Sequence, residues 1–69
     1  MQLSARNQLT GTVKKIVEGA VNSEVTIEVA PGVEITAVVT KSSVARLGLK
    51  ESSPAVAVIK ASSVMVGVE

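Results

Sequence analysis

The sequence contains 69 residues, enough for one small domain, and it has no cysteine and no histidine. Such a chain has neither disulfide bonds nor the usual ligands of a structural zinc ion. Seven basic and six acidic residues give a net charge of +1, too little to attract a polyanion such as DNA. No apolar run approaches the ~20 residues of a membrane span, so we expect no membrane association.

After a polar start, the chain alternates between apolar and polar positions, as strands with one buried face do. In the segment EVTIEVA, Val25, Ile27 and Val29 share one face, and polar residues occupy the other. The same alternation, or an enrichment in β-branched residues, recurs along the chain. It predicts five strands, at residues 11–19, 24–30, 33–39, 55–61 and 64–69.

Two interruptions organise these strands. Pro31 and Gly32 predict a turn between the second and third strands, because proline fixes φ and glycine tolerates positive φ. The segment TKSSVARLGL then predicts a short helix, with Thr40 as N-cap and Gly48 just after its end. Three strands, a helix and two strands is the order of an OB-type barrel. We therefore predict an all-β fold, a five-stranded OB-like barrel with one short helix between strands 3 and 4, forming a single domain over residues 1–69.

The size of the chain predicts self-association. A domain this small buries too little apolar surface to offset comfortably the conformational entropy lost on folding. Disulfides and structural metals are the usual remedies, and the composition removes both. At the same time 46% of the residues are hydrophobic, more than one small core can enclose. We therefore expect an obligate homo-oligomer.

Composition also argues against two functions that the fold could support. OB-type barrels bind single-stranded nucleic acid by stacking bases on aromatic rings, and this chain has no Phe, Tyr or Trp. Without histidine or cysteine, the common nucleophilic triads cannot form. A pair of Lys60 with Ser62 or Ser63 lacks any motif that strains and activates a nucleophile. We therefore expect neither nucleic-acid binding nor catalysis.

Three groups of hydrogen-bond donors remain, none with a carboxylate inside it. They are Ser4, Arg6 and Asn7; Thr40, Ser42 and Ser43; and Lys60, Ser62 and Ser63. Hydroxyls, cationic side chains and the free N–H groups at a helix start suit a small, multiply charged oxyanion. Each group alone also has an ordinary interpretation, respectively a solvated lead-in, a helix cap and a strand end. Only their joint occurrence favours an anion site.

The segments SARNQLTGTV, TKSSV and VIKASSVMVGVE closely resemble the Mop (molbindin) family of small molybdate-binding proteins. The resemblance runs from Met1 to Glu69 and therefore covers the whole chain. It implies an OB-like barrel that assembles as a hexamer, a trimer of dimers. It also implies that molybdate or tungstate is the ligand, held at subunit interfaces, and that no catalytic cofactor is involved.

The resemblance further implies which residues bind the anion. The matching positions are Ser4, Ala5, Arg6, Thr40, Ser43, Lys60, Ala61 and Ser62. Of these, Thr40 and Ser43 would approach the anion from a neighbouring subunit, and Lys60 would be the positive partner of the dianion. Because some relatives place a hydroxyl one residue earlier, either Ala61 or Ser62 would make the contact that follows Lys60. Val21 corresponds to a stretch that lines a second class of site.

The function that follows is a molybdate or tungstate store for molybdenum homeostasis. The start of the chain, MQLSARNQ, lacks the charged and apolar regions of a signal peptide, so we expect a cytoplasmic protein. The alternative is a structural or regulatory oligomerisation module in which anion binding is incidental. A response to molybdate that differs from the response to sulfate would separate the two.

Overall fold

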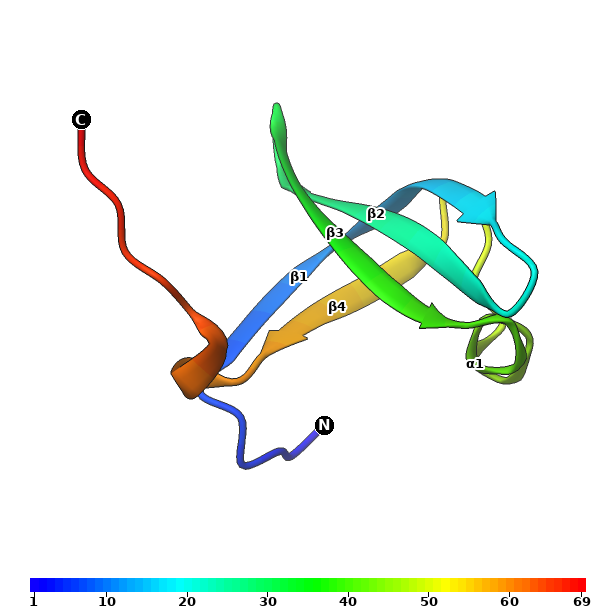
Figure 1. Cartoon of the computed structure of the whole chain (residues 1–69), viewed down its shortest axis with the longest axis horizontal. Helices are drawn as coiled ribbons and strands as arrows, with labels where there is room; N and C mark the ends of the chain where they lie inside the picture. Colours follow the sequence, from blue (N-terminus) through cyan, green and yellow to red (C-terminus); the bar gives the residue numbers. More distant parts are fainter.

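A computed structural model describes all 69 residues as one curled antiparallel sheet with a short helix at one end (Figure 1). The helix α1 lies between the third and fourth strands, and a short 3₁₀ turn, η1, follows the fourth. In chain order the elements are β1 (Asn7–Glu18), β2 (Asn22–Ala30), β3 (Val33–Thr40), α1 (Lys41–Leu47), β4 (Pro54–Ile59) and η1 (Ala61–Ser63). No helix is long and apolar enough to cross a membrane.

The four strands lie in the order β3-β2-β1-β4, and each pairs antiparallel with its neighbours. Strand β1 is the longest, with 12 residues, and it serves two partners in succession. Its first half, from Asn7 to Thr12, pairs with β4, and its second half, from Thr12 to Glu18, pairs with β2. The sheet therefore curls about the middle of β1, as the strands of an OB-like barrel do.

The curl has a local cause in the sequence. A side chain at Gly11 would place its Cβ 2.3 Å from the Glu28 carbonyl oxygen, so only glycine allows β2 to approach β1 this closely. Just beyond it, the register of the β1–β2 ladder shifts between Val13 and Lys15. A bulge of this kind increases the local twist and bends the strand.

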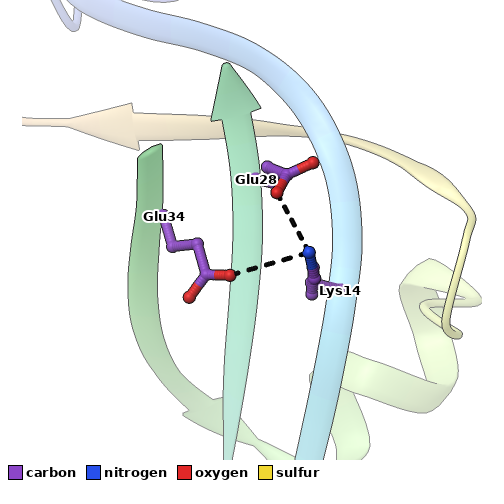
Figure 2. A network of polar contacts seen from close by, with 3 residues as sticks. All are labelled: Lys14, Glu28 and Glu34. Carbon is purple, nitrogen blue, oxygen red and sulfur yellow. Dashed lines mark hydrogen bonds and ion pairs between the residues drawn. The ribbon is translucent and has the colours of Figure 1, made fainter. Parts of the chain in front are cut away.

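The Lys14 side chain, which leaves β1 at this bulge, ties three strands together (Figure 2). Its Nζ lies 3.0 Å from Glu28 Oε2 on β2 and 4.0 Å from Glu34 Oε2 on β3. Glu28 and Glu34 face each other across the β2–β3 ladder, and like charges in that position repel. The hydrogen bond to Glu28, followed by its charge, raises the pKa of Lys14 above its usual 10.5.

The core is very small. Only Val13, Val25, Ile27 and Ala57 are buried hydrophobic residues, and Ser23 is the one buried polar residue. The alternation in β2 that predicted its inward face is confirmed, since Val25 and Ile27 are core residues. Many other large hydrophobic side chains remain exposed, which is the surplus that the composition predicted.

The short helix and the turn before it form as local sequence rules predict. The Thr40 Oγ1 accepts a hydrogen bond from the Ser43 backbone N–H at 3.1 Å and so caps α1. Gly48 ends the helix in the left-handed region, with φ of 65°. Gly32, in the turn between β2 and β3, also has a positive φ, of 75°. The predicted helix between strands 3 and 4 is therefore confirmed.

The prediction of a fifth strand is wrong. Residues 64–69 follow η1 as an extended, exposed segment that pairs with no strand, so the sheet has four strands and not five. The alternation of Val64, Val66 and Val68 is strand-like, but a strand also needs a free edge to pair with, and this segment runs away from its own sheet (Figure 1).

Two strand ends also differ from the prediction. Strand β1 begins at Asn7, four residues before the predicted start at Gly11, because β4 supplies partners for these polar residues. Strand β4 ends at Ile59, so Lys60 and Ala61 lie outside it and not within it. Both differences arise at the same end of the sheet.

Candidate oxyanion site

Two segments from opposite ends of the chain meet where β1 begins and β4 ends (Figure 1). Asn7 pairs with Ile59 across the ladder, and the Asn7 side-chain amide donates to the Ile59 carbonyl at 3.2 Å. Residues 4–6, just before β1, and residues 60–62, just after β4, therefore leave the sheet side by side. This end of the sheet carries the first and third donor groups of the sequence.

A hollow of about 590 Å³ lies between these two segments. It is lined by Ser4, Ala5, Arg6, Val58, Lys60, Ala61 and Ser62. The polar side chains are a guanidinium, an ammonium and two hydroxyls, and no carboxylate is among them. The first three and the last three predicted positions of the anion set thus meet in one place.

The donors in this hollow have no partner within the chain. The side chains of Arg6, Lys60, Ser4 and Ser62 take part in none of its side-chain hydrogen bonds or ion pairs. All four residues are exposed, and the hollow is open on one side and much larger than a single tetrahedral anion. One chain therefore presents two positive charges and two hydroxyls that have no acidic or hydrogen-bonding partner, around an open hollow.

The turn η1 explains how three consecutive residues line one hollow. Lys60 keeps an extended backbone, with φ of −63° and ψ of 132°, and the chain then tightens. The Ser63 N–H donates to the Lys60 carbonyl at 2.9 Å, and the Val64 N–H donates to the Ala61 carbonyl at 3.3 Å. In a continued strand, Lys60 and Ala61 would point to opposite faces. The turn instead curls both of them, with Ser62, around the same space.

Asn7 has a different role from the one its sequence neighbours suggested. The sequence groups it with Ser4 and Arg6 as a free donor, but its amide donates a hydrogen bond to the Ile59 carbonyl and it does not line the hollow. Its contribution is to hold the start of β1 against the end of β4. Asn7 is thus a structural residue that positions the two segments bordering the hollow.

Val58 is a wall residue that the sequence reasoning missed. The sequence predicts only that it lies in a strand, yet it lines the hollow two residues before Lys60. Because side chains alternate along a strand, residues two apart share a face, and that spacing was the available signal. Its side chain makes part of the lining of the hollow apolar.

The second donor group lies elsewhere in the chain. Thr40, Ser42 and Ser43 sit at the start of α1, at the opposite end of the sheet from η1 (Figure 1). Their hydroxyls bond to one another, with Thr40 Oγ1 at 2.8 Å from Ser43 Oγ and at 3.1 Å from Ser42 Oγ. Within one chain this group caps the helix, and it contributes nothing to the hollow.

Val21 lies beside that second group. It is an exposed residue of the turn between β1 and β2, and its carbonyl accepts a hydrogen bond from the Lys41 N–H at 3.0 Å. A smaller hollow of about 330 Å³ near this turn is lined by Glu18 and Glu24 and not by Val21. Two carboxylates make that hollow unsuited to an anion.

Comparison with known proteins places the chain in a family. A family model described as the TOBE domain matches residues 3–66, which is nearly the whole chain. The chain belongs to the TOBE-domain family. A relative of this TOBE-domain chain, the probable molybdenum-pterin-binding protein of Haemophilus influenzae, is 46% identical over 69 residues, with 100% of both chains covered.

Two solved structures show that the similarity of this TOBE-domain chain to known proteins includes the fold. MopII from Clostridium pasteurianum, in an apo form, matches with a TM-score of 0.90 at 42% identity, over 97% of this chain and all of that one. The cytoplasmic molybdate-binding protein ModG, solved with molybdate bound, matches with a TM-score of 0.94 at 61% identity, over 100% of this chain and 49% of ModG. These matches confirm the resemblance to the Mop family. The Haemophilus relative and ModG are both described as binding proteins, which is the predicted class of function.

Proposed function

We propose that this chain is a single Mop domain that binds molybdate, or tungstate, through the donors of the hollow between residues 4–6 and 60–62. The observation that carries the proposal is the convergence of Arg6, Lys60, Ser4 and Ser62 in a space without a carboxylate. ModG, which is described as binding molybdate and is 61% identical to this chain, supports the identity of the anion.

The chemistry of the donors explains the choice among anions. Molybdate carries no proton at neutral pH, so a cage that only donates hydrogen bonds satisfies all four of its oxygens. Monohydrogen phosphate carries a proton that needs an acceptor, and leaving it unpaired costs roughly 1–3 kcal/mol. Sulfate offers only acceptors too, but its oxygens lie closer to the central atom and reach fewer donors. Tungstate has nearly the size of molybdate and is expected to bind comparably.

The free oxyanion is favoured over a pterin-bound form, although a relative is described as a molybdenum-pterin-binding protein. A pterin is a flat ring system, and stacking on an aromatic side chain would contribute about 0.5–1.5 kcal/mol beyond the area that it buries. This chain has no Phe, Tyr or Trp to stack on it. Its donors instead match the oxygens of the inorganic ion.

The site is completed, we propose, by a second subunit in a homo-oligomer, a hexamer built as a trimer of dimers. The hollow of one chain is open, and its donors cover only one side. The hydroxyls of Thr40 and Ser43, at the far end of the sheet, would reach the anion from the neighbouring chain, and the Val21 turn beside them would line a second class of site. The physiological role is storage of molybdate for molybdenum homeostasis in the cytoplasm.

Isothermal titration of the purified protein with molybdate, tungstate, sulfate and phosphate tests the proposal. Micromolar affinity requires about −8 kcal/mol, which several charge-assisted hydrogen bonds of ~1.5–3 kcal/mol each supply after desolvation. We expect molybdate and tungstate to bind with similar affinity and at least tenfold more tightly than sulfate or phosphate. An equal response to all four anions would reject the proposal and favour an oligomerisation module with incidental anion binding.

A further inference from the structure

Two consecutive carboxamides lie at the start of β1, and each donates a hydrogen bond to a main-chain carbonyl. The Gln8 Nε2 donates to the Ala5 carbonyl at 3.0 Å, and the Asn7 Nδ2 donates to the Ile59 carbonyl at 3.2 Å. The amide nitrogen must face the carbonyl in both cases, because a carbonyl oxygen only accepts hydrogen bonds. Two acceptors are thus covered at the end of the sheet that borders the donor hollow, the hollow between residues 4–6 and 60–62.

The two carboxamides lie on opposite faces of the sheet. Gln8 pairs with Val58 across the β1–β4 ladder, and Asn7 pairs with Ile59. Residues directly opposite each other in a ladder share a face, and successive residues alternate between the faces. Val58 lines the donor hollow and Ile59 does not. Gln8 is therefore the carboxamide on the face of the sheet that borders the donor hollow.

The bond from Gln8 is also what holds the segment before β1 in place. Residues 4–6 precede the first pair of the β1–β4 ladder, so no strand partner fixes them. They take part in no main-chain hydrogen bond of the turns and loops, and the bond from Gln8 to Ala5 is their only bond to a side chain. Three of the seven residues that line the donor hollow belong to this segment. Their position therefore depends on one side chain.

The Ala5 carbonyl is an acceptor in a lining whose side chains offer donors. Ala5 lines the donor hollow, and no backbone N–H donates to its carbonyl. A carbonyl oxygen accepts hydrogen bonds and cannot donate one, so it repels an oxygen of molybdate. The same carbonyl would accept the proton of monohydrogen phosphate. An uncovered Ala5 carbonyl would thus favour phosphate over molybdate.

We propose that Gln8 determines the specificity of the anion site by covering the Ala5 carbonyl. Its N–H group uses a lone pair of that oxygen and places a partial positive charge against it. The ligand then meets hydrogen-bond donors, which suit an anion without a proton. Gln8 is a positioning residue and not a ligand, because it does not line the donor hollow. This role rests on the proposed function and adds to it a residue that separates molybdate from phosphate.

Sulfate distinguishes this role from a purely structural one. Like molybdate, sulfate carries no proton at neutral pH, so an uncovered carbonyl repels both anions. Only monohydrogen phosphate gains a hydrogen-bond partner. Loss of the Gln8 amide therefore lowers the affinity ratio of molybdate to phosphate but not the ratio of molybdate to sulfate. If Gln8 only kept residues 4–6 in place, its loss would change the two ratios together.

Gln8→Met tests this role, because methionine has nearly the length of glutamine but no N–H group. Titration calorimetry at pH 8, with molybdate displaced by sulfate or phosphate, gives the three affinities, and circular dichroism checks the fold. We expect the molybdate-to-phosphate ratio to fall about three- to tenfold, and the molybdate-to-sulfate ratio to stay within about twofold of the parent value. Unchanged ratios, or two ratios that fall together, would overturn the proposal.

Gln2→Met is the matched control. Gln2 is the other glutamine of the chain, forms no side-chain hydrogen bond and does not line the donor hollow. Its replacement should leave both ratios at the parent value. A fall in the molybdate-to-phosphate ratio as large as that in Gln8→Met would count against a specific role of Gln8.

Gln8→Lys restores a donor at the same position. Its ammonium group can reach the Ala5 carbonyl, so we expect the molybdate-to-phosphate ratio to return to the parent value. The added positive charge strengthens the binding of all three anions, which is why the ratio and not the affinity is compared. A ratio as low as that of Gln8→Met would contradict the role of the N–H group.

The parent protein separates this proposal from the proposed function. If the parent responds equally to all three anions, the proposed function fails and the role of Gln8 fails with it. If the parent prefers molybdate and Gln8→Met keeps both ratios, the proposed function stands and only the role of Gln8 is wrong. A selective gain of phosphate in Gln8→Met supports both.

Discussion

At the scale of single residues, the site depends on donors that the chain leaves unused. Arg6 and Lys60 are cationic side chains without an acidic partner, whereas Lys14 is held by Glu28 and Glu34. Hydrogen bonding satisfies Thr40 and Asn7 internally as well. Arg6 and Lys60 differ from the other unpaired cations in lying together, with two hydroxyls, around one hollow.

Substituting Lys60 with alanine should weaken molybdate binding by about 10- to 100-fold, since one charge-assisted hydrogen bond of ~1.5–3 kcal/mol is lost. Arg6→Ala should have a similar effect. Lys50→Ala is the matched control, because it removes the same charge from a loop that does not line the hollow. Titration calorimetry measures the affinities, and circular dichroism checks that each variant is folded. Parent-like affinity in Lys60→Ala would refute this assignment.

The acid–base behaviour of Lys14 gives a second prediction. Glu28 raises the pKa of Lys14 in the folded chain above its value in the unfolded chain. Its contribution to stability is therefore fully present below about pH 10.5 and is lost as the pH rises through the higher, folded pKa. The contribution is small, because the pair is exposed and screened by solvent.

Urea unfolding of the parent and of Lys14→Gln checks this behaviour. We expect the parent to have the higher midpoint at pH 8, and the gap between the two to narrow above pH 10.5. Lys15→Gln is the control, because Lys15 forms no ion pair. A gap that grows with pH would contradict the sign of the shift.

At the scale of elements, the sequence predicted what local rules decide and missed what distant pairing decides. Thr40 and Gly48 mark the ends of α1, and Gly32 marks a turn, because each meets a requirement of its immediate backbone. The first residues of β1 look like a loop in the sequence, since Asn7 and Gln8 are polar. They form a strand because β4 lies beside them, and no local pattern reveals that partner.

The close approach of β1 and β2 at Gly11 predicts a large effect of a small change. In Gly11→Ala the new methyl group would lie 2.3 Å from a backbone carbonyl, which cannot rotate away. The strands must separate, so we expect a loss of about 1–3 kcal/mol in the free energy of unfolding. Gly67→Ala is the control, because a methyl group there meets nothing within 4 Å. Equal urea midpoints for the parent and Gly11→Ala would contradict the close packing.

At the scale of the whole molecule, one chain is an incomplete unit. Its core holds four buried hydrophobic residues, its sheet has an open apolar side, and its donor hollow is open to solvent. Size and composition alone predict that one chain needs a partner, and self-association stays a prediction. The open apolar side of the sheet could not be predicted from the sequence, because it depends on how the sheet curls.

Only part of the candidate site could be predicted from the sequence. Four of the predicted residues lie at the end of the sheet where β1 begins and β4 ends, namely Ser4, Arg6, Lys60 and Ser62. Residues that the sequence groups by donor chemistry are therefore also neighbours in space. Thr40 and Ser43 share that chemistry but lie at the other end of the sheet. Sequence patterns show their shared chemistry but not this separation in space, and a contribution from a second chain stays a prediction.

Ser43→Ala tests whether a neighbouring chain contributes to the site. This change removes a hydroxyl but leaves the Ser43 backbone N–H that bonds to the Thr40 Oγ1, so the helix cap survives. We expect molybdate binding to weaken by about tenfold, from the loss of one hydrogen bond to a charged group. Ser42→Ala is the control, since it removes a hydroxyl from the same helix turn at a position outside the proposed set. Identical affinities for the two variants would argue against a contribution from α1.

The most direct test of the central claim is anomalous diffraction at the molybdenum edge from crystals grown with excess molybdate. It locates the anion without any assumption about its contacts. We predict a strong peak within hydrogen-bonding distance of Arg6, Lys60 and Ser62, with α1 of a second copy on its open side. Peaks only at other places on the surface, or none at all, would contradict the account.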